Sequence, residues 1–120
     1  MTPRTPFERF SKMRRENDAQ KITLLMRDAE RGNARAQRLL ALRYWRGRGV
    51  AQSVELAAEW MKQSAAQGWA LAQRDLAGFY QSGIGVEQDA AEALRLYRLA
   101  ARQGDPIAAN FIEGMEHKCD

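Results

Sequence analysis

The side chains that could carry out chemistry are few in this sequence, and their spacing does not bring them together. His117 is the only histidine and Cys119 the only cysteine among 120 residues. A single thiol can form neither an internal disulfide nor a cysteine-based metal site. An exposed histidine near the C-terminus explains His117 better than a catalytic base or a metal ligand does. We therefore predict a protein that is not an enzyme and that uses no cofactor and no metal.

Two glycine pairs are the remaining candidates, because glycine-rich loops can bind phosphate groups. Gly47 and Gly49 enclose one residue, and so do Gly83 and Gly85. Neither pair is accompanied by the rest of a phosphate-binding or dinucleotide-binding signature. We interpret both pairs as structural turns between helices, where glycine permits a positive φ or a close approach of two backbones.

The two turns belong to a repeat of 36 residues. Gly32, Gly68 and Gly104 stand 36 residues apart, and segments 32–67 and 68–103 are identical at 15 of 36 positions. Ordinary composition would give roughly two or three identities in a random register. Self-similarity at a fixed period of 20–50 residues is typical of a solenoid. The sequence is therefore that of a repeat protein.

Each unit predicts a helix, a glycine turn and a second helix, with helices ending near Arg31, Arg46, Gln67, Ser82 and Gln103. Asp89, followed three residues later by Glu92, predicts a capping box. The predicted inward-facing residues of the first unit are Ala36, Leu40, Ala41, Tyr44, Ala57, Trp60, Met61 and Ala65. We expect an all-α, right-handed αα superhelix that comprises a half-unit (17–31), full units (32–67 and 68–103) and a C-terminal capping helix (104–117).

The N-terminal segment 1–16 carries +3 of the net charge of +4. Phe7, Phe10 and Met13 are spaced by three, which predicts a short helix that either caps the solenoid or docks on a partner. The basic charge leaves open an alternative function, weak binding of nucleic acid or an anionic surface through this segment. No apolar run approaches the ~20 residues that span a bilayer, and we expect a cytoplasmic protein.

The unit resembles the Sel1-like repeat, a relative of the tetratricopeptide repeat, over about residues 17–117. The residues that carry the resemblance, together with their partners 36 positions later, are Ala36, Gln37, Leu40, Ala41, Tyr44, Gly47, Gly49, Val50, Ala57, Trp60, Ala65 and Gly68. Ser53 replaces the aspartate that is kept at Asp89, and the paired cysteines of secreted members are absent. The resemblance implies a superhelix that holds other proteins; in bacteria such modules serve regulatory, envelope-associated and effector-neutralising roles.

In related solenoids, the outward stripe of each first helix lines a concave groove. Here that stripe comprises Arg35, Arg38, Leu39, Leu42 and Arg46, then Leu71, Arg74, Asp75, Gly78 and Ser82, and then Ile107, Asn110, Phe111, Gly114 and Lys118. Arginines among apolar residues suit a protein or peptide partner that is both acidic and apolar. Alternatively, the arginines are merely solvated and the apolar residues pack between helices. Trp45 and Trp69 are either interface anchors or covers of the seam between units. We expect an adaptor or scaffold.

Overall fold

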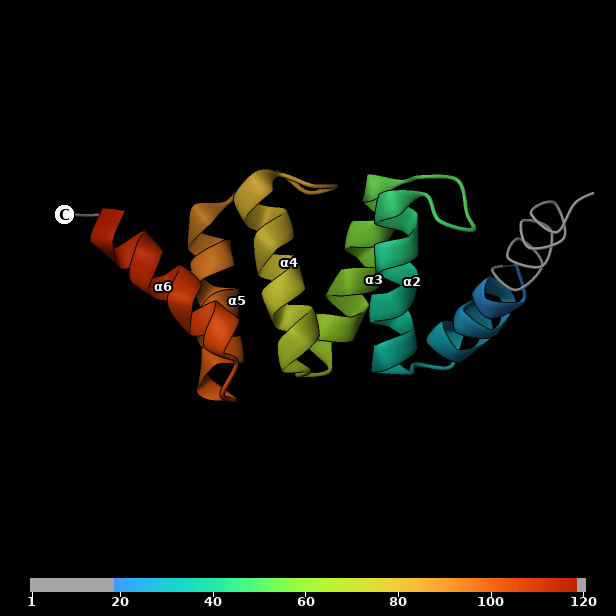
Figure 1. The fold of residues 1–120 in the computed structure, drawn as a ribbon, viewed down its shortest axis with the longest axis horizontal. Helices are drawn as coiled ribbons and strands as arrows, with labels where there is room; N and C mark the ends of the chain where they lie inside the picture. Colours follow the sequence, from blue (N-terminus) through green and yellow to red (C-terminus); the bar gives the residue numbers. More distant parts are fainter. Residues whose placement is uncertain (1–18, 119–120) are drawn as a thin grey trace, which may run out of the picture.

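The computed structural model describes residues 19–118, and it is helical throughout apart from the connecting turns (Figure 1). A first helix covers residues 19–30. The five that follow are α2 (Ala34–Arg46), α3 (Val54–Ala66), α4 (Ala70–Ser82), α5 (Ala90–Arg102) and α6 (Pro106–Lys118). Within the described residues there is no strand, and the predicted all-α solenoid is confirmed. The predictions for segment 1–16, for His117 and for Cys119 fall outside the described residues or side chains.

Polar side chains begin the helices at matching places in the repeat. Asn33, Ser53 and Asp89 each accept a hydrogen bond from the backbone N–H three residues later, at 2.9, 3.2 and 3.0 Å. Such caps satisfy one of the N–H groups that have no partner inside the helix. Ser53 and Asp89 are 36 residues apart, so the serine replaces the aspartate without loss of the cap. Trp69 occupies the N-cap position of α4, but its side chain makes no capping hydrogen bond.

The predicted capping box at the start of α5 forms only in part. The backbone N–H of Glu92 donates to Asp89, as a capping box requires. The carboxylate of Glu92 does not return to the backbone of Asp89, because it accepts a hydrogen bond from Arg95 at 3.0 Å. The N–H of Asp89 instead donates to the carbonyl of Tyr80 at 2.9 Å, which closes the turn.

Glycines end the first helix of each unit. Gly47 and Gly83 have φ values of 69° and 73°, in the left-handed region where a Cβ is unfavourable. The second turn glycines, Gly49 and Gly85, have φ values of 80° and 66°. Accordingly α2 and α4 end at the predicted residues, while α3 and α5 end one residue before the predicted ones.

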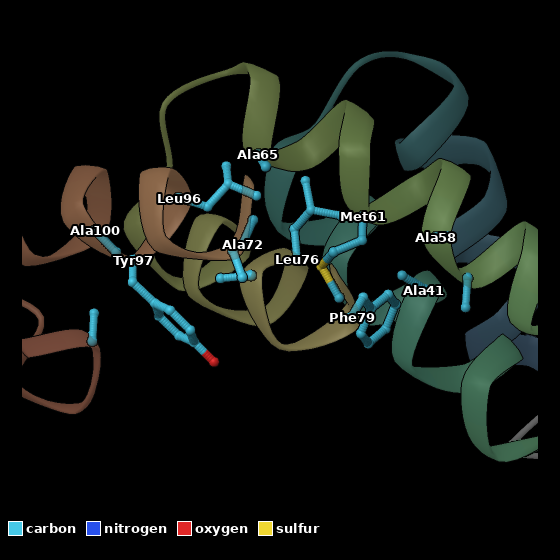
Figure 2. Packing of buried hydrophobic residues seen from close by; sticks show 14 residues of the cluster. Ala41, Ala58, Met61, Ala65, Ala72, Leu76, Phe79, Leu96, Tyr97 and Ala100 are labelled. Carbon is cyan, nitrogen blue, oxygen red and sulfur yellow. The ribbon is translucent and has the colours of Figure 1, made fainter. Parts of the chain in front are cut away.

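Alanine makes up much of the core, which lets the helices pack closely (Figure 2). The larger buried side chains interleave with these alanines and include Leu40, Met61, Leu76, Phe79, Leu96 and Tyr97. Three aromatic residues at core positions of the repeat, Tyr44, Trp60 and Tyr80, are only half-buried. Phe79 is 3% exposed although the repeat places an arginine, Arg43, at the equivalent position. No helix within residues 19–118 is long and apolar enough to cross a bilayer.

Recurrent glutamines connect the two helices of each unit. Gln67 donates from Nε2 to Oε1 of the buried Gln37 at 2.8 Å. One repeat later, Gln103 donates to Oε1 of the buried Gln73 at 2.9 Å. A buried carboxamide without a partner would be costly, so the two glutamines of each unit depend on each other. These pairs explain why both glutamine positions are preserved between the units.

Candidate functional site

The first helices of three successive units, α2, α4 and α6, border one hollow of about 400 Å³. We call it the central groove. Its lining residues are Leu42, Trp45, Arg74, Asp75, Gly78, Phe79, Gln81, Ser82, Ile84, Tyr97, Ile107 and Phe111. Most belong to the stripe that the sequence predicts as outward-facing. The hollow exists because the period of 36 residues brings this stripe to the same side in each unit.

Aromatic rings form the two walls of the central groove. On one side the rings of Trp45 and Phe79 lie 5.7 Å apart at 58°. On the other side Tyr97 and Phe111 stack at 4.9 Å with an interplanar angle of 11°. Gly78 lies between these pairs in α4, and a Cβ at this position would meet the Tyr97 hydroxyl at 3.8 Å. The groove is therefore walled by rings that are held in place, while Gly78 keeps the space between them open.

Tyr97 also supplies a fixed polar group beside the rings. Its hydroxyl donates to Oε1 of Gln81 at 3.0 Å. Burial, and to a lesser extent the negative charge of Asp75, raise the pKa of Tyr97 above its usual value. The neutral hydroxyl therefore remains a hydrogen-bond donor at neutral pH.

Two predicted binding arginines, Arg38 and Arg74, connect successive units. Nε of Arg38 lies 2.6 Å from Oδ2 of Asp75, and its guanidinium lies 5.7 Å from the Trp69 ring. Nη1 of Arg74 lies 3.2 Å from Oδ2 of the buried Asp105. The alternative that the predicted arginines are merely solvated does not hold for Arg38 and Arg74, because each forms an ion pair and has a side chain less than one-fifth exposed.

The residues that the sequence predicts to bind a partner divide between the groove and its surroundings. Leu42, Trp45, Arg74, Asp75 and Phe111 line the central groove. The others, which do not line it, are Arg35, Arg38, Leu39, Arg46, Leu71 and Trp69.

Of the predicted arginines, Arg35 and Arg46 are exposed. The guanidinium of Arg46 lies 5.5 Å from the ring of Trp45, at the edge of the groove. Trp45 and Trp69 are both half-buried and pack on the core that joins the units. This arrangement favours the interpretation that they cover a seam between units, although Trp45 also lines the groove.

Tyr97 and Ile84 line the groove although no pattern in the sequence predicts them there. Tyr97 occupies a core position of the second helix, and Ile84 is the variable residue of a glycine turn. The sequence contained one signal for Tyr97, which stands where the first unit has Met61. A tyrosine at a core position needs a polar partner for its buried hydroxyl, and Met61 does not. The groove can bind apolar side chains and accept or donate a few hydrogen bonds. The described residues hold no group of three His, Cys, Asp or Glu side chains that could bind a metal.

Helices of equal length that recur with a 36-residue period define this chain as an αα solenoid. The family model of the Sel1 repeat matches residues 34–69 and 70–105, and the chain belongs to the Sel1-repeat family. Sel1 repeats generally mediate protein–protein interaction, and proteins built from them are typically not enzymes. Among curated proteins, none matches this sequence.

Two solved structures are similar to this chain. One is a Sel1 repeat protein from Oxalobacter formigenes, with 36% sequence identity and a TM-score of 0.75 over 78% of this chain and 70% of that protein. The other is c5321, a protective antigen of uropathogenic Escherichia coli strains that has an SLR fold. It has 35% identity and a TM-score of 0.73 over 76% of this chain. This chain covers only 20% of c5321.

Proposed function

We propose that this protein is a non-enzymatic adaptor that binds a segment of another protein in the central groove. The observation that carries the proposal is the apolar wall of α6. Ile107 and Phe111 are 47% and 42% exposed, and they border the hollow together with Leu42 and Trp45. Exposed apolar side chains around a concave site are typical of surfaces that bind proteins or peptides. A hollow of about 400 Å³ can accept a large apolar side chain of a partner.

The charges near the groove refine the character of the partner. Arg38 and Arg74 are neutralised by Asp75 and Asp105, so they offer little net charge to a ligand. Of the four predicted arginines, Arg35 and Arg46 are exposed and can meet an acidic residue of the partner. We therefore propose a partner segment with one apolar anchor for the hollow and an acidic residue beside α2. Exposed charges of this kind mainly increase the association rate and its dependence on salt.

A peptide-display experiment tests this proposal with no need to choose a partner in advance. Peptides are selected from a random phage-displayed library on the full chain, and their affinities are measured by fluorescence polarisation. Phe111→Ser should weaken the selected peptides at least about tenfold, because a central apolar anchor contributes more than 1.4 kcal/mol. Leu56→Ser is the matched control, since Leu56 is 40% exposed and lies outside the groove. Equal affinity for the two variants would refute binding in the central groove.

Replacing both Arg35 and Arg46 by glutamate tests the electrostatic part separately. We expect weaker binding of acidic peptides and a smaller dependence of the remaining affinity on salt. Unchanged salt dependence would show that the partner needs no acidic residue beside α2.

A further inference from the structure

The turn of the second unit packs on the first unit through a glycine. Gly85 has a φ of 66°, and a Cβ there would lie 2.6 Å from the carbonyl carbon of Val54 and 3.0 Å from Cβ of Ala58. Both residues belong to the N-terminal half of α3. The flanking Ile84 and Val86 are half-buried and pack on the core. The surface of α3 thus accepts an aliphatic–glycine–aliphatic segment, in which only glycine allows the backbone to come this close.

The matching surface of α5 borders a second, larger hollow. Ala90 and Leu94 are the residues 36 positions after Val54 and Ala58. Ala58 is only 1% exposed beneath the turn, whereas Ala90 is exposed and Leu94 is half-buried. We call this open hollow of about 1050 Å³ between the N-terminal half of α5 and α6 the α5–α6 cleft.

The side chains beside the α3 surface differ from those beside the α5 surface, and this difference explains why the α5–α6 cleft is open. At the α3 surface the large rings of Trp45 and Phe79 pack together beside the turn. At the α5 surface the equivalent positions hold Gln81 and Met115, and both line the α5–α6 cleft. Gly114, also in the lining, carries no side chain, and neither does Gly78 at the equivalent position. The α5–α6 cleft is therefore open because Gln81 and Met115 stand where the first unit has the packed rings.

The polar groups of the cleft suit a backbone that is not in a helix. Asn110 is exposed and lines the cleft together with Gln81 and Gln88. Carboxamides can both donate to carbonyls and accept from N–H groups. The backbone of a helical ligand satisfies itself, so these groups favour a loop segment whose N–H and C=O groups are still available. Nε2 of Gln88 is itself bound to the carbonyl of Gln81 at 2.8 Å, which fixes this edge of the cleft.

Because the two surfaces occupy equivalent places in the repeat, we infer that the α5–α6 cleft is a second binding site, which takes an aliphatic–glycine–aliphatic loop segment of a partner protein. The chain itself supplies the template, because Ile84, Gly85 and Val86 occupy the corresponding surface of α3. This inference goes beyond the proposed function. Although the cleft and the central groove share Gln81, Ile107 and Phe111 in their linings, the alanines of α5 line only the cleft.

A peptide copied from the turn provides the probe. A capped peptide with the sequence of residues 82–88 is titrated into the ¹⁵N-labelled full chain, and amide shifts are followed by NMR. We expect saturable shifts around Ala90, Ala91 and Leu94. A peptide carrying Gly85→Val should bind at least about tenfold more weakly, because the added side chain prevents the close approach of the backbone.

Matched substitutions in the protein locate the site. Ala91→Glu places a charge in the cleft and should reduce peptide binding at least about tenfold. Ala91 is exposed in the first turn of α5, where glutamate is compatible with the helix dipole, so the fold is retained. Ala109→Glu is the control, since Ala109 is exposed near the start of α6 and does not line the cleft. This variant should bind the peptide as the wild type does.

Three results would overturn the inference. The first is an absence of saturable shifts, or equal binding of the glycine and valine peptides. The second is binding that survives Ala91→Glu but is lost in Phe111→Ser, which would assign the peptide to the central groove. The third is self-association of the chain that Ala91→Glu abolishes without any peptide binding, which would identify a second copy as the occupant. Library peptides that bind in the central groove should bind Ala91→Glu as they bind the wild type, because Ala91 lines only the cleft.

Discussion

Replacing Gly85 by alanine should destabilise the fold through two separable effects. A residue with a Cβ at φ 66° is disfavoured by about 1–2 kcal/mol relative to glycine. The new methyl group would also collide with the backbone of Val54 and with the methyl group of Ala58. Because the backbone of α3 cannot rotate aside as a flexible side chain would, we assign about 1–3 kcal/mol to this overpacking. The expected total is roughly 2–5 kcal/mol.

Two other glycines isolate the contact from the conformational effect. Gly68 has a φ of 88°, and a Cβ there would meet no atom within 4 Å. Gly83 has a φ of 73°, and its Cβ would make an ordinary contact with Gln88 at 3.5 Å. Alanine at either position should therefore cost only the conformational part, about 1–2 kcal/mol. Gly85→Ala should be the least stable of the three variants.

Urea denaturation followed by circular dichroism at the helical band measures the free energy of unfolding of each variant. Each kcal/mol corresponds to a shift in melting temperature of roughly 4–8 °C in domains of 60–100 residues and roughly 2–4 °C in domains of 150–250 residues, and this chain of 120 residues lies between them. The difference between Gly85→Ala and Gly68→Ala measures the contact between the turn and α3. A difference below about 0.5 kcal/mol, the usual range of a neutral surface change, would refute the close packing of the turn on the first unit.

Arg38→Ala should reduce the free energy of unfolding by about 1–2 kcal/mol, because it leaves the half-buried Asp75 without its 2.6 Å partner. Arg35 is exposed, so Arg35→Ala should change the free energy of unfolding by no more than about 0.5 kcal/mol. Equal effects in urea denaturation would contradict a structural role for the Arg38–Asp75 pair. The raised pKa of Tyr97 predicts a loss of stability at high pH. Since the unfolded chain releases the tyrosine proton near the usual pKa of 10.0 and the folded chain does so only at higher pH, the free energy of unfolding should fall above about pH 10. Tyr97→Phe should reduce this fall, and identical pH profiles would argue against the burial of the hydroxyl.

The outward stripe of the first helices was predictable because it follows from helical geometry alone. Once Leu40 and Leu76 point inward, the angle of 100° per residue places Leu42 and Gly78, each two residues later, on the opposite side. The partners of the arginines on that stripe were not predictable. Arg38 pairs with a residue 37 positions away, and that distance depends on the angle between two units. A sequence pattern contains the period of the units but not the rotation between them.

The chain alone determined the repeat, the fold class and nearly every helix boundary, because these depend on local features. The side chains of Ser53 and Asp89, together with the glycines at positions 47 and 83, act within one or two helical turns. The tertiary structure decided which surfaces stay open. Ala58 is covered while Leu94 is left half-buried, although both occupy the same position of the repeat. That difference arises from what the neighbouring unit brings against each helix, and packing between units depends on the shapes of all the side chains at the seam.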